Sequence, residues 1–204
     1  MVRVVRSQGA AMSGGISVAA SPDQNDEARL IRRVAAGDRR AFETLYRLYH
    51  PRLTRFLLNI LRKPELVEEV INDTLVAVWR RPDSYNGSSK LSTWIFAIAF
   101  RKALKARSRL DEPVEDKDPD SRPSDEAGPE QQLGLRQAQQ VLLEALKGLS
   151  PDHRTVVDLT YFHEFGYREI AEIMDCPVDT VKTRMFHARR NLRNMLAGGL
   201  ADWL

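Results

Sequence analysis

The stretch GYREIAEIMDCPVDTVKTRMFHARR, residues 166–190, decides the fold of the second half of this chain. Its first part reads as a short helix, and Glu169 stands where its side chain can reach back and cap the start of that helix. The triplet Asp175-Cys176-Pro177 reads as a turn, and Pro177 is suited to the first position of a longer helix. Two helices joined by so short a turn predict a helix-turn-helix.

The longer helix of this pair has two faces. Apolar residues return along it at spacings of four and three, which predicts a buried face made of Val181, Met185, Ala188, Leu192 and Met195. The other face consists of Asp179, Lys182, Thr183, Phe186, His187 and Arg190. Outward Lys, Thr, His and Arg side chains are typical of a recognition helix that enters the DNA major groove. Short helix pairs also occur in proteins that bind no DNA, but the cations and the outward Phe186 favour DNA binding.

Apolar residues recur at spacings of three and four in the rest of the chain as well, so the predicted fold class is all-α. A first helix stops at Gly37, and a long second helix starts after Asp38 and contains Pro51, which predicts a kink or a break. A third helix opens at Pro64, and a fourth runs over residues 92–109. Two further helices precede the helix-turn-helix and carry Leu142, Leu143, Leu146 and Leu149, and then Val156, Val157, Leu159 and Tyr161.

An acidic segment divides these helices into two groups. Residues 111–130 hold nine acidic and two basic residues, four prolines and one aliphatic residue, Val114, and cannot bury enough surface to fold. We therefore predict two small helical domains, residues 25–110 and 133–204, joined by a flexible acidic linker over residues 111–132. Residues 1–24 are predicted to be a disordered tail.

The third helix, residues 64–80, has a polar face at spacings of three and four that its packing does not explain. This face consists of Glu65, Glu69, Asn72 and Asp73. Acidic residues in a first helical turn favour the helix dipole, but Asp73 lies too far along for that effect. The residues alone leave two interpretations open, a solvated face and a surface that docks on another protein.

The fourth helix mixes an aromatic with cations on the side that we expect to face solvent, at Trp94, Ala97, Arg101, Lys105 and Ser108. Cations that follow phosphates beside rings that stack on unpaired bases are typical of single-stranded nucleic-acid binding. In the alternative interpretation Trp94 belongs to the core and the cations only face water. The residues alone do not decide between the two.

Composition excludes several classes of protein. The net charge over 204 residues is only +3, but it is unevenly distributed. Positions 1–110 hold 20 basic and 10 acidic residues, and the acidic segment offsets most of this excess. A basic half favours a polyanionic partner. The longest apolar run, Trp94 to Phe100, is seven residues long and too short to span a bilayer. One cysteine, four histidines, and no nucleotide-binding loop or activated nucleophile predict a cytoplasmic protein without metal or cofactor that is not an enzyme.

Six blocks of the sequence, taken in order and spacing, resemble the extracytoplasmic-function group of bacterial RNA polymerase sigma factors. They are residues 41–49, 67–79, 91–99, 149–151, 167–174 and 176–190. The resemblance covers about residues 25–110, which correspond to sigma region 2, and 135–197, which correspond to sigma region 4. It implies an all-helical initiation factor that binds core RNA polymerase and promoter DNA, with an anti-sigma factor as a further expected partner.

The resemblance also implies roles for particular residues. In the first domain the third helix docks on the clamp of the polymerase through Glu69, Asn72, Asp73 and Trp79, and the following loop and fourth helix open and read the proximal promoter element through Asn86, Trp94, Arg101 and Lys105. In the second domain the distal promoter element is read through Lys182, Thr183, Phe186 and His187, with Arg190 on phosphates.

The chain departs from the family pattern at a few positions. The loop reads Tyr85-Asn86-Gly87-Ser88 where the family has Phe-Arg-Gly, and Ala97, Arg101 and Asp179 replace the family's Arg, Asn and Gly. Base preference at the proximal element is the property that these changes affect. Cys176 resembles a turn residue that packs and caps. The alternative function is an autonomous helix-turn-helix regulator that acts without polymerase. A third hypothesis is a helical adaptor that binds no DNA, but this hypothesis leaves the cations from Lys182 to Arg190 unexplained.

Overall fold

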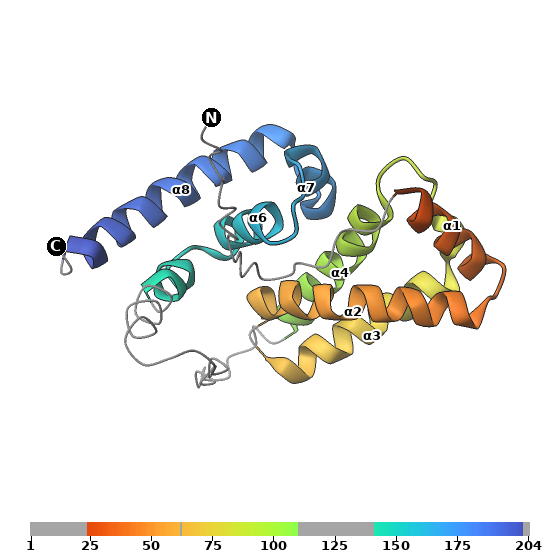
Figure 1. Ribbon diagram of the computed structural model, residues 1–204. Helices are drawn as coiled ribbons and strands as arrows, with labels where there is room; N and C mark the ends of the chain where they lie inside the picture. Colours follow the sequence, from red (N-terminus) through yellow and green to blue (C-terminus); the bar gives the residue numbers. More distant parts are fainter. Residues whose placement is uncertain (1–23, 62, 110–140, 202–204) are drawn as a thin grey trace, which may run out of the picture.

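The computed structural model describes residues 24–61, 63–109 and 141–201, and all regular structure in these ranges is helical, as predicted (Figure 1). The helices are α1 (Gln24–Ala35), α2 (Arg39–Leu61), α3 (Pro64–Arg80), the 3-10 turn η1 (Pro82–Ser84), α4 (Leu91–Ser108), α6 (Pro151–Tyr161), α7 (Tyr167–Met174) and α8 (Val178–Ala201). Residues 141–147 are helical too. The expected acidic linker lies outside the described residues, and so does the expected tail except Gln24. No helix in the described part of the chain has the length and hydropathy of a membrane span.

The start of α2 is fixed by Asp38, as the sequence predicts. Its Oδ1 accepts hydrogen bonds from the backbone N–H groups of Arg40 at 2.9 Å and Ala41 at 3.1 Å, while its Oδ2 binds the Arg33 guanidinium at 2.7 Å. The hydrogen bond from Arg33 has the largest effect on the pKa of Asp38, and together these bonds hold that pKa below its usual value. Gly37 turns the chain between α1 and α2 with a φ of +79°, which glycine adopts without strain.

Pro51 does not break α2, so the prediction of a break is wrong. The helix runs from Arg39 to Leu61 with the proline inside it. Pro51 itself is exposed, while Tyr49 and Leu53 on either side are fully buried. The hydrogen bond that proline cannot make therefore falls on the solvent side, where water can replace it, and the buried neighbours hold the helix together.

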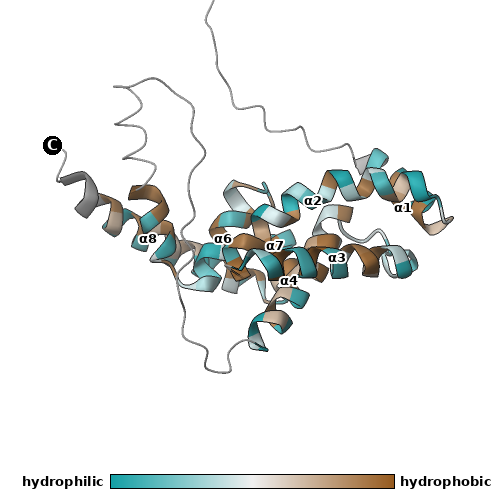
Figure 2. Ribbon diagram, turned by 90° about the horizontal axis from the view of Figure 1, so that it is seen from below, coloured by the Kyte–Doolittle hydropathy of each residue, from teal (hydrophilic) through white to brown (hydrophobic). Residues whose placement is uncertain are grey.

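The core of the first half (residues 24–109) lies between α2, α3 and α4, and α1 packs against α2. The hydroxyl of Tyr49 donates a hydrogen bond of 2.6 Å to Glu27, whose side chain lies almost wholly buried beneath α1. Burial raises the pKa of Tyr49 well above its ordinary range, and the Glu27 carboxylate raises it further. In Figure 2 hydrophobic residues concentrate along α3 and where α4 and α7 lie, and hydrophilic ones along α1 and α2.

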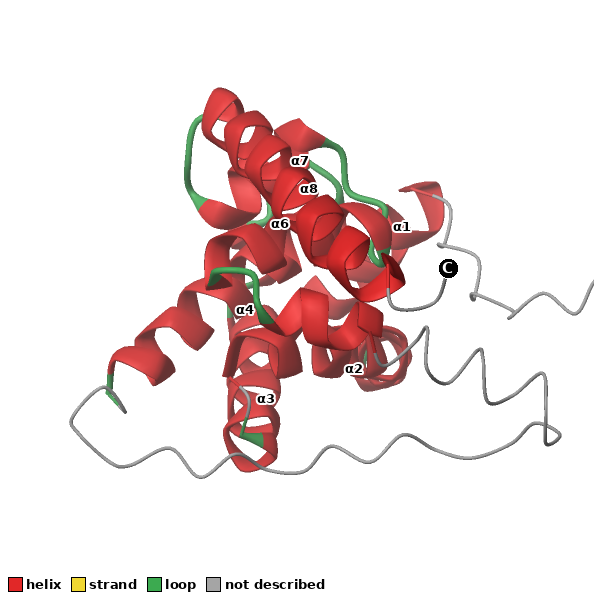
Figure 3. Cartoon of the chain, turned by 90° about the vertical axis from the view of Figure 1, so that its left-hand side faces the viewer, coloured by secondary structure: helices red, strands yellow, loops and turns green. Residues whose placement is uncertain are grey.

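The two halves of the described chain pack against each other. Helix α7 lies against α4, and α6 lies against α2, so the second half (residues 141–201) forms a layer over the first (Figure 3). Phe96 of α4 contacts both Phe165 and His163 of the second half, with ring centroids 5.0 and 4.9 Å apart. The sequence predicted two domains but not this contact between them.

Four expectations about burial are wrong. Tyr161, which the sequence groups with Val156, Val157 and Leu159, is 55% exposed. Ala97 is 7% exposed rather than on the solvent side, because the second half packs on that side of α4. Leu142 and Leu143 are 42% and 43% exposed, and Met195 is 39% exposed, although their spacing suggested buried stripes. These three side chains lie near ends of helices, where fewer neighbours are available to cover an apolar stripe.

Candidate nucleic-acid interface

The helix-turn-helix has the predicted geometry at its first helix. Oε2 of Glu169 accepts a hydrogen bond of 2.8 Å from the backbone N–H of Gly166, which is the predicted cap. Asp175 ends α7 in the left-handed conformation with a φ of 49°, and the backbone N–H of Cys176 bonds to the carbonyl of Ala171 at 3.0 Å. Helix α8 begins at Val178, one residue later than predicted.

Helix α8 presents the predicted outward face. Val181, Met185 and Ala188 are buried, which turns the candidate distal-element residues Lys182, Thr183, Phe186, His187 and Arg190 outward. Phe186 is 64% exposed, although large apolar side chains are usually covered in a free protein. An exposed ring between cations is the arrangement that suits contact with a DNA base edge or methyl group.

The polar side chains at the start of this face contact each other. Lys182 Nζ donates to Asp179 Oδ1 at 2.9 Å, and the Thr183 hydroxyl donates to the Asp179 carbonyl at 2.9 Å. An exposed ion pair of this kind contributes little to stability, so Lys182 can exchange Asp179 for a phosphate or base at low cost. Asp179 is therefore a weak, exchangeable partner of Lys182 in the free protein.

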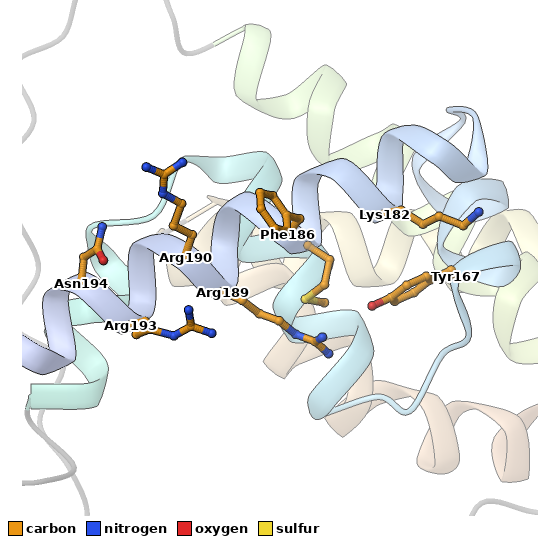
Figure 4. A pocket seen from close by; sticks show the side chains of 8 residues that line it. Tyr167, Lys182, Phe186, Arg189, Arg190, Arg193 and Asn194 are labelled. Carbon is orange, nitrogen blue, oxygen red and sulfur yellow. The ribbon is translucent and has the colours of Figure 1, made fainter.

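A hollow between α7 and α8 gathers cations beside this face (Figure 4). It is lined by Tyr167, Lys182, Met185, Phe186, Arg189, Arg190, Arg193 and Asn194, a set with four cations and no acid. Sequence reasoning missed Tyr167, because it belongs to the other helix of the pair, and Arg189, whose Nε donates to the Tyr161 hydroxyl at 3.1 Å. A cationic hollow beside exposed reading residues fits a phosphate backbone.

Helix α6 supports the recognition helix from behind. Arg184 pairs with Asp152 of α6, and the rings of His153 and His187 stand 6.1 Å apart. Burial lowers the pKa of His153, and the facing His187 lowers it further. Cys176 is half-buried beside Arg184, and burial raises the pKa of its thiol, which fits the predicted packing role.

The polar face of α3 is exposed along its length. Glu65, Glu69, Asn72 and Asp73 all face solvent, and Asp73 reaches Lys102 of α4 at 3.4 Å. Trp79 differs, because it is half-buried against Phe42 with ring centroids 5.0 Å apart. Val76 lies on the same exposed side and is 43% exposed, a residue that the sequence reasoning did not single out. A row of exposed carboxylates can dock on a partner of opposite charge, and an exposed apolar side chain adds contact area.

The loop before α4 is held by its own side chains. Asn86 Oδ1 accepts from the backbone N–H of Ser88 at 3.0 Å and from its hydroxyl at 2.7 Å, and Gly87 makes the turn with a φ of +75°. Trp94 is half-buried with its ring 5.4 Å from that of Tyr85. Arg101 and Lys105 are exposed, so α4 offers a partly exposed aromatic ring followed by two cations.

Two family models match this chain. The model described as Sigma-70 region 2 matches residues 45–112, and that described as Sigma-70, region 4 matches residues 139–192. The ECF RNA polymerase sigma-E factor of Escherichia coli (strain K12) is 30% identical over 176 residues, which cover 81% of this chain and 91% of that protein. The ECF RNA polymerase sigma-E factor of Haemophilus influenzae is 28% identical over 184 residues, or 85% of this chain and 97% of that protein.

Solved structures agree with these matches. The sigma factor RpoE in its co-crystal with the anti-sigma factor NepR from Bartonella quintana has a TM-score of 0.60 and 27% identity, and covers 76% of this chain and 96% of that chain. The fold is also that of CnrH in complex with the cytosolic domain of CnrY, with a TM-score of 0.62, 22% identity, and coverage of 86% and 99%. The chain therefore belongs to the extracytoplasmic-function group of the sigma-70 family, the sigma factors that direct RNA polymerase to promoters.

Proposed function

We propose that this sigma factor reads a promoter with two surfaces of its own, the outward face of α8 on the distal element and the side of α4 on the proximal element. The observation that carries the proposal is the α8 face, where Lys182, Phe186 and His187 stand exposed over a buried stripe. Base contacts by a few side chains in the first half of a recognition helix are the usual mode of such domains.

At the proximal element we propose that Asn86, Trp94, Arg101 and Lys105 bind the opened strand. The exposed cations support contact with phosphates, and the half-buried Trp94 leaves part of its ring free for a base. Because Trp94 is supported by Tyr85, its ring has a fixed orientation before DNA arrives, which lowers the entropy cost of stacking.

The exposed face of α3 is the proposed docking surface for core polymerase. Its carboxylates at Glu69 and Asp73, with Asn72 beside them, support a basic partner, and Val76 supplies an apolar contact. Trp79 contributes through its exposed edge and by fixing α3 on α2 through Phe42. The extents of the two domains, residues 25–110 and 133–204, are supported by the two matched regions.

An anti-sigma factor is a further proposed partner, supported by the solved complexes of RpoE with NepR and of CnrH with CnrY. We expect the factor to act in the cytoplasm, where polymerase and DNA meet, and to catalyse no reaction of its own. Within the described residues no three His, Cys, Asp or Glu side chains are placed to hold a metal ion.

Selection of promoters from a random library tests the proposal. The protein is incubated with DNA fragments alone or with core polymerase, and the fragments that yield transcripts or bound complexes are sequenced. We expect a two-element motif only when core polymerase is present. Tight and sequence-specific binding by the protein alone, without stimulation of core polymerase, would show an autonomous regulator instead.

A further inference from the structure

Three basic side chains and one carboxylate gather where α6 packs against α8. They are Asp152 and His153 in the first turn of α6, and Arg184 and His187, one turn apart on α8. The carboxylate of this group is already engaged, because the Arg184 guanidinium pairs with Asp152. The two imidazoles therefore face each other without it, with ring centroids 6.1 Å apart and planes 29° from parallel.

His153 is the imidazole of this pair that stays neutral. Its ring is half-buried, and its Nδ1 is buried without a hydrogen-bond partner among the described residues. Its place in the first turn of α6 is at the positive end of the helix dipole, which opposes a further positive charge. Burial lowers the pKa of His153 most, the facing His187 lowers it further, and the opposing effect of Asp152 is smaller.

His187 is the imidazole that can carry the charge. Its side chain is exposed on the outward face of α8, where water or an acceptor on DNA can stabilise a cation. Besides His153, its ring meets that of Phe186 on the same face, with centroids 5.5 Å apart. Because two facing imidazoles cannot both be charged at low cost, a neutral His153 leaves the proton to His187.

The other charged groups around His187 favour its protonation on DNA rather than in the free protein. On α8, the cations Arg184 and Arg190 lie one turn before it and one turn after it. The titratable groups of α7, which also packs on α8, are Tyr167 in the cationic hollow, Glu169 at Gly166 and Lys90, and the exposed Arg168 and Glu172. Neighbouring cations oppose a proton on His187 in the free protein, whereas an acceptor on DNA favours it.

Charge decides what an imidazole can read in a DNA groove. A cationic imidazole donates from both ring nitrogens, whereas a neutral one donates from one nitrogen and accepts at the other. Guanine presents two acceptors, N7 and O6, in the major groove, so a charged donor selects guanine. A neutral imidazole makes a weaker selection, because it fits donors and acceptors alike.

We propose that His187 reads a guanine edge of the distal element as an imidazolium ion, and that this recognition takes up one proton from solvent because the facing His153 stays neutral. The proposal rests on the function proposed above for α8. The acceptors of guanine favour the charged form of His187, so the complex holds one proton more than its free components. Affinity for the guanine-bearing promoter therefore rises as the pH falls. His153 acts through His187 and is a positioning residue.

The test compares promoters that differ in one base pair of the distal element. Core polymerase carrying the full chain binds labelled promoter fragments with each base at each position of that element, at about pH 8 and about pH 6. The ratio of two affinities at one pH cancels any effect of pH on the polymerase itself. We expect the preference for guanine at one position to grow about tenfold over this range. Replacement of that guanine by 7-deazaguanine, which lacks the N7 acceptor, should remove the growth.

Variants at the two histidines identify the group that takes up the proton. His187→Arg, a permanent cation, should keep the guanine preference at both pH values, and His187→Gln should lose it at both. His153→Lys sets a cation against His187 and should suppress the growth, whereas the neutral His153→Leu should retain it. His50→Gln is the matched control, because it removes an imidazole that lies on α2 and should change nothing. Circular dichroism checks that each variant is folded.

Proton NMR titration of the parent protein gives a second readout of the role of His153, which does not depend on the folding of a variant. The ring signal of His187 should respond to protonation at a higher pH than that of His153. The reverse order would overturn the assignment of His153 as the neutral partner.

The outcomes separate this proposal from the function on which it rests. A guanine preference that is equal at both pH values, or growth that survives in His187→Gln, would overturn proton uptake and leave the proposed reading by α8 intact. An equal effect of pH on all four bases would also overturn it, because this result indicates a phosphate contact. The absence of any base preference at the distal element, at either pH, would instead overturn the proposed function.

Discussion

Single side chains on α8 differ in how far they can reach into a DNA groove. Lys182 and His187 lie in the first half of the helix, and Arg190 lies farther along beside the cationic hollow. Base contacts carry sequence information, and phosphate contacts carry affinity alone. The exposure of all three is consistent with both roles, so position along the helix is what separates them.

Alanine at Lys182 or at His187 should flatten the preference for the distal element by about 1–3 kcal/mol per contact in transcription from randomised promoters. Arg190→Ala should instead lower output similarly on all promoters and reduce the dependence of binding on salt. Thermal melts check that each variant is folded. A change of preference in Arg190→Ala, with none in the other two, would contradict this placement of α8 in the groove.

The thiol of Cys176 should react slowly in the native protein. Burial raises its pKa, which outweighs the lowering effect of the Arg184 guanidinium, and only the thiolate reacts with iodoacetamide. A raised pKa means less thiolate at a given pH, so the native rate should stay below that of the urea-unfolded chain at neutral pH and approach it only at alkaline pH. A native rate equal to the unfolded one at neutral pH would indicate a stabilised thiolate and a redox role.

Whole elements show which features a sequence can predict. The starts of α2, α3 and α7 follow from Asp38, Pro64 and Glu169, because caps and prolines act through neighbours in the chain. The α4–α7 contact does not follow in this way, because Thr93 and Glu169 are 76 residues apart in the sequence. One signal was present, since the unbroken apolar run from Trp94 to Phe100 is typical of a helix that is covered on more than one side.

The site residues also divide into those that the sequence predicts and those that depend on long-range packing. The outward face of α8 follows from the period of its buried stripe, but the neighbouring Tyr167 comes from another helix and depends on how the pair is packed. Ala97 was placed on the wrong side because its burial comes from the second half of the chain. Periodicity gives the face of a helix, while long-range packing decides which faces stay open.

Helix α3 carries the prediction for polymerase docking. Asp73→Arg should weaken binding to core polymerase by about 2–5 kcal/mol, because it replaces a carboxylate by a cation opposite a basic surface of the partner. Folding should change little, since the Asp73 side chain is 65% exposed and its pair with Lys102 is long. Binding is measured by surface plasmon resonance and helicity by circular dichroism.

Glu43→Arg is the matched control, because it reverses an exposed carboxylate that also pairs with a cation, Arg47, but lies on α2. This variant should bind core polymerase normally. Undiminished binding of Asp73→Arg, or a similar loss in both variants, would remove α3 as the docking surface.

The molecule as a whole is held by side chains that serve both halves. Phe96 packs on Phe56 of its own half and on His163 and Phe165 of the other. Truncation of such a residue removes contacts from two cores at once, whereas Phe42, which packs at a tilt against Trp79, serves the first half only. Cooperativity between the halves should therefore depend on Phe96.

Calorimetry should show one unfolding transition for the parent protein. Phe96→Ala should lower stability by about 3–5 kcal/mol and divide the transition in two, because it uncouples the halves. Phe42→Ala should lower the transition temperature but leave a single transition. A parent protein that already unfolds in two separate steps would contradict the coupling.

Glu169 uses one carboxylate oxygen to start α7 and the other to hold Lys90. This double use limits which substitutions the position tolerates. A change at Lys90 removes the ion pair and leaves the cap of α7 intact, whereas most changes at Glu169 remove both at once. Glutamine can still accept the bond from Gly166 and so keeps the start of the DNA-binding helix-turn-helix in place.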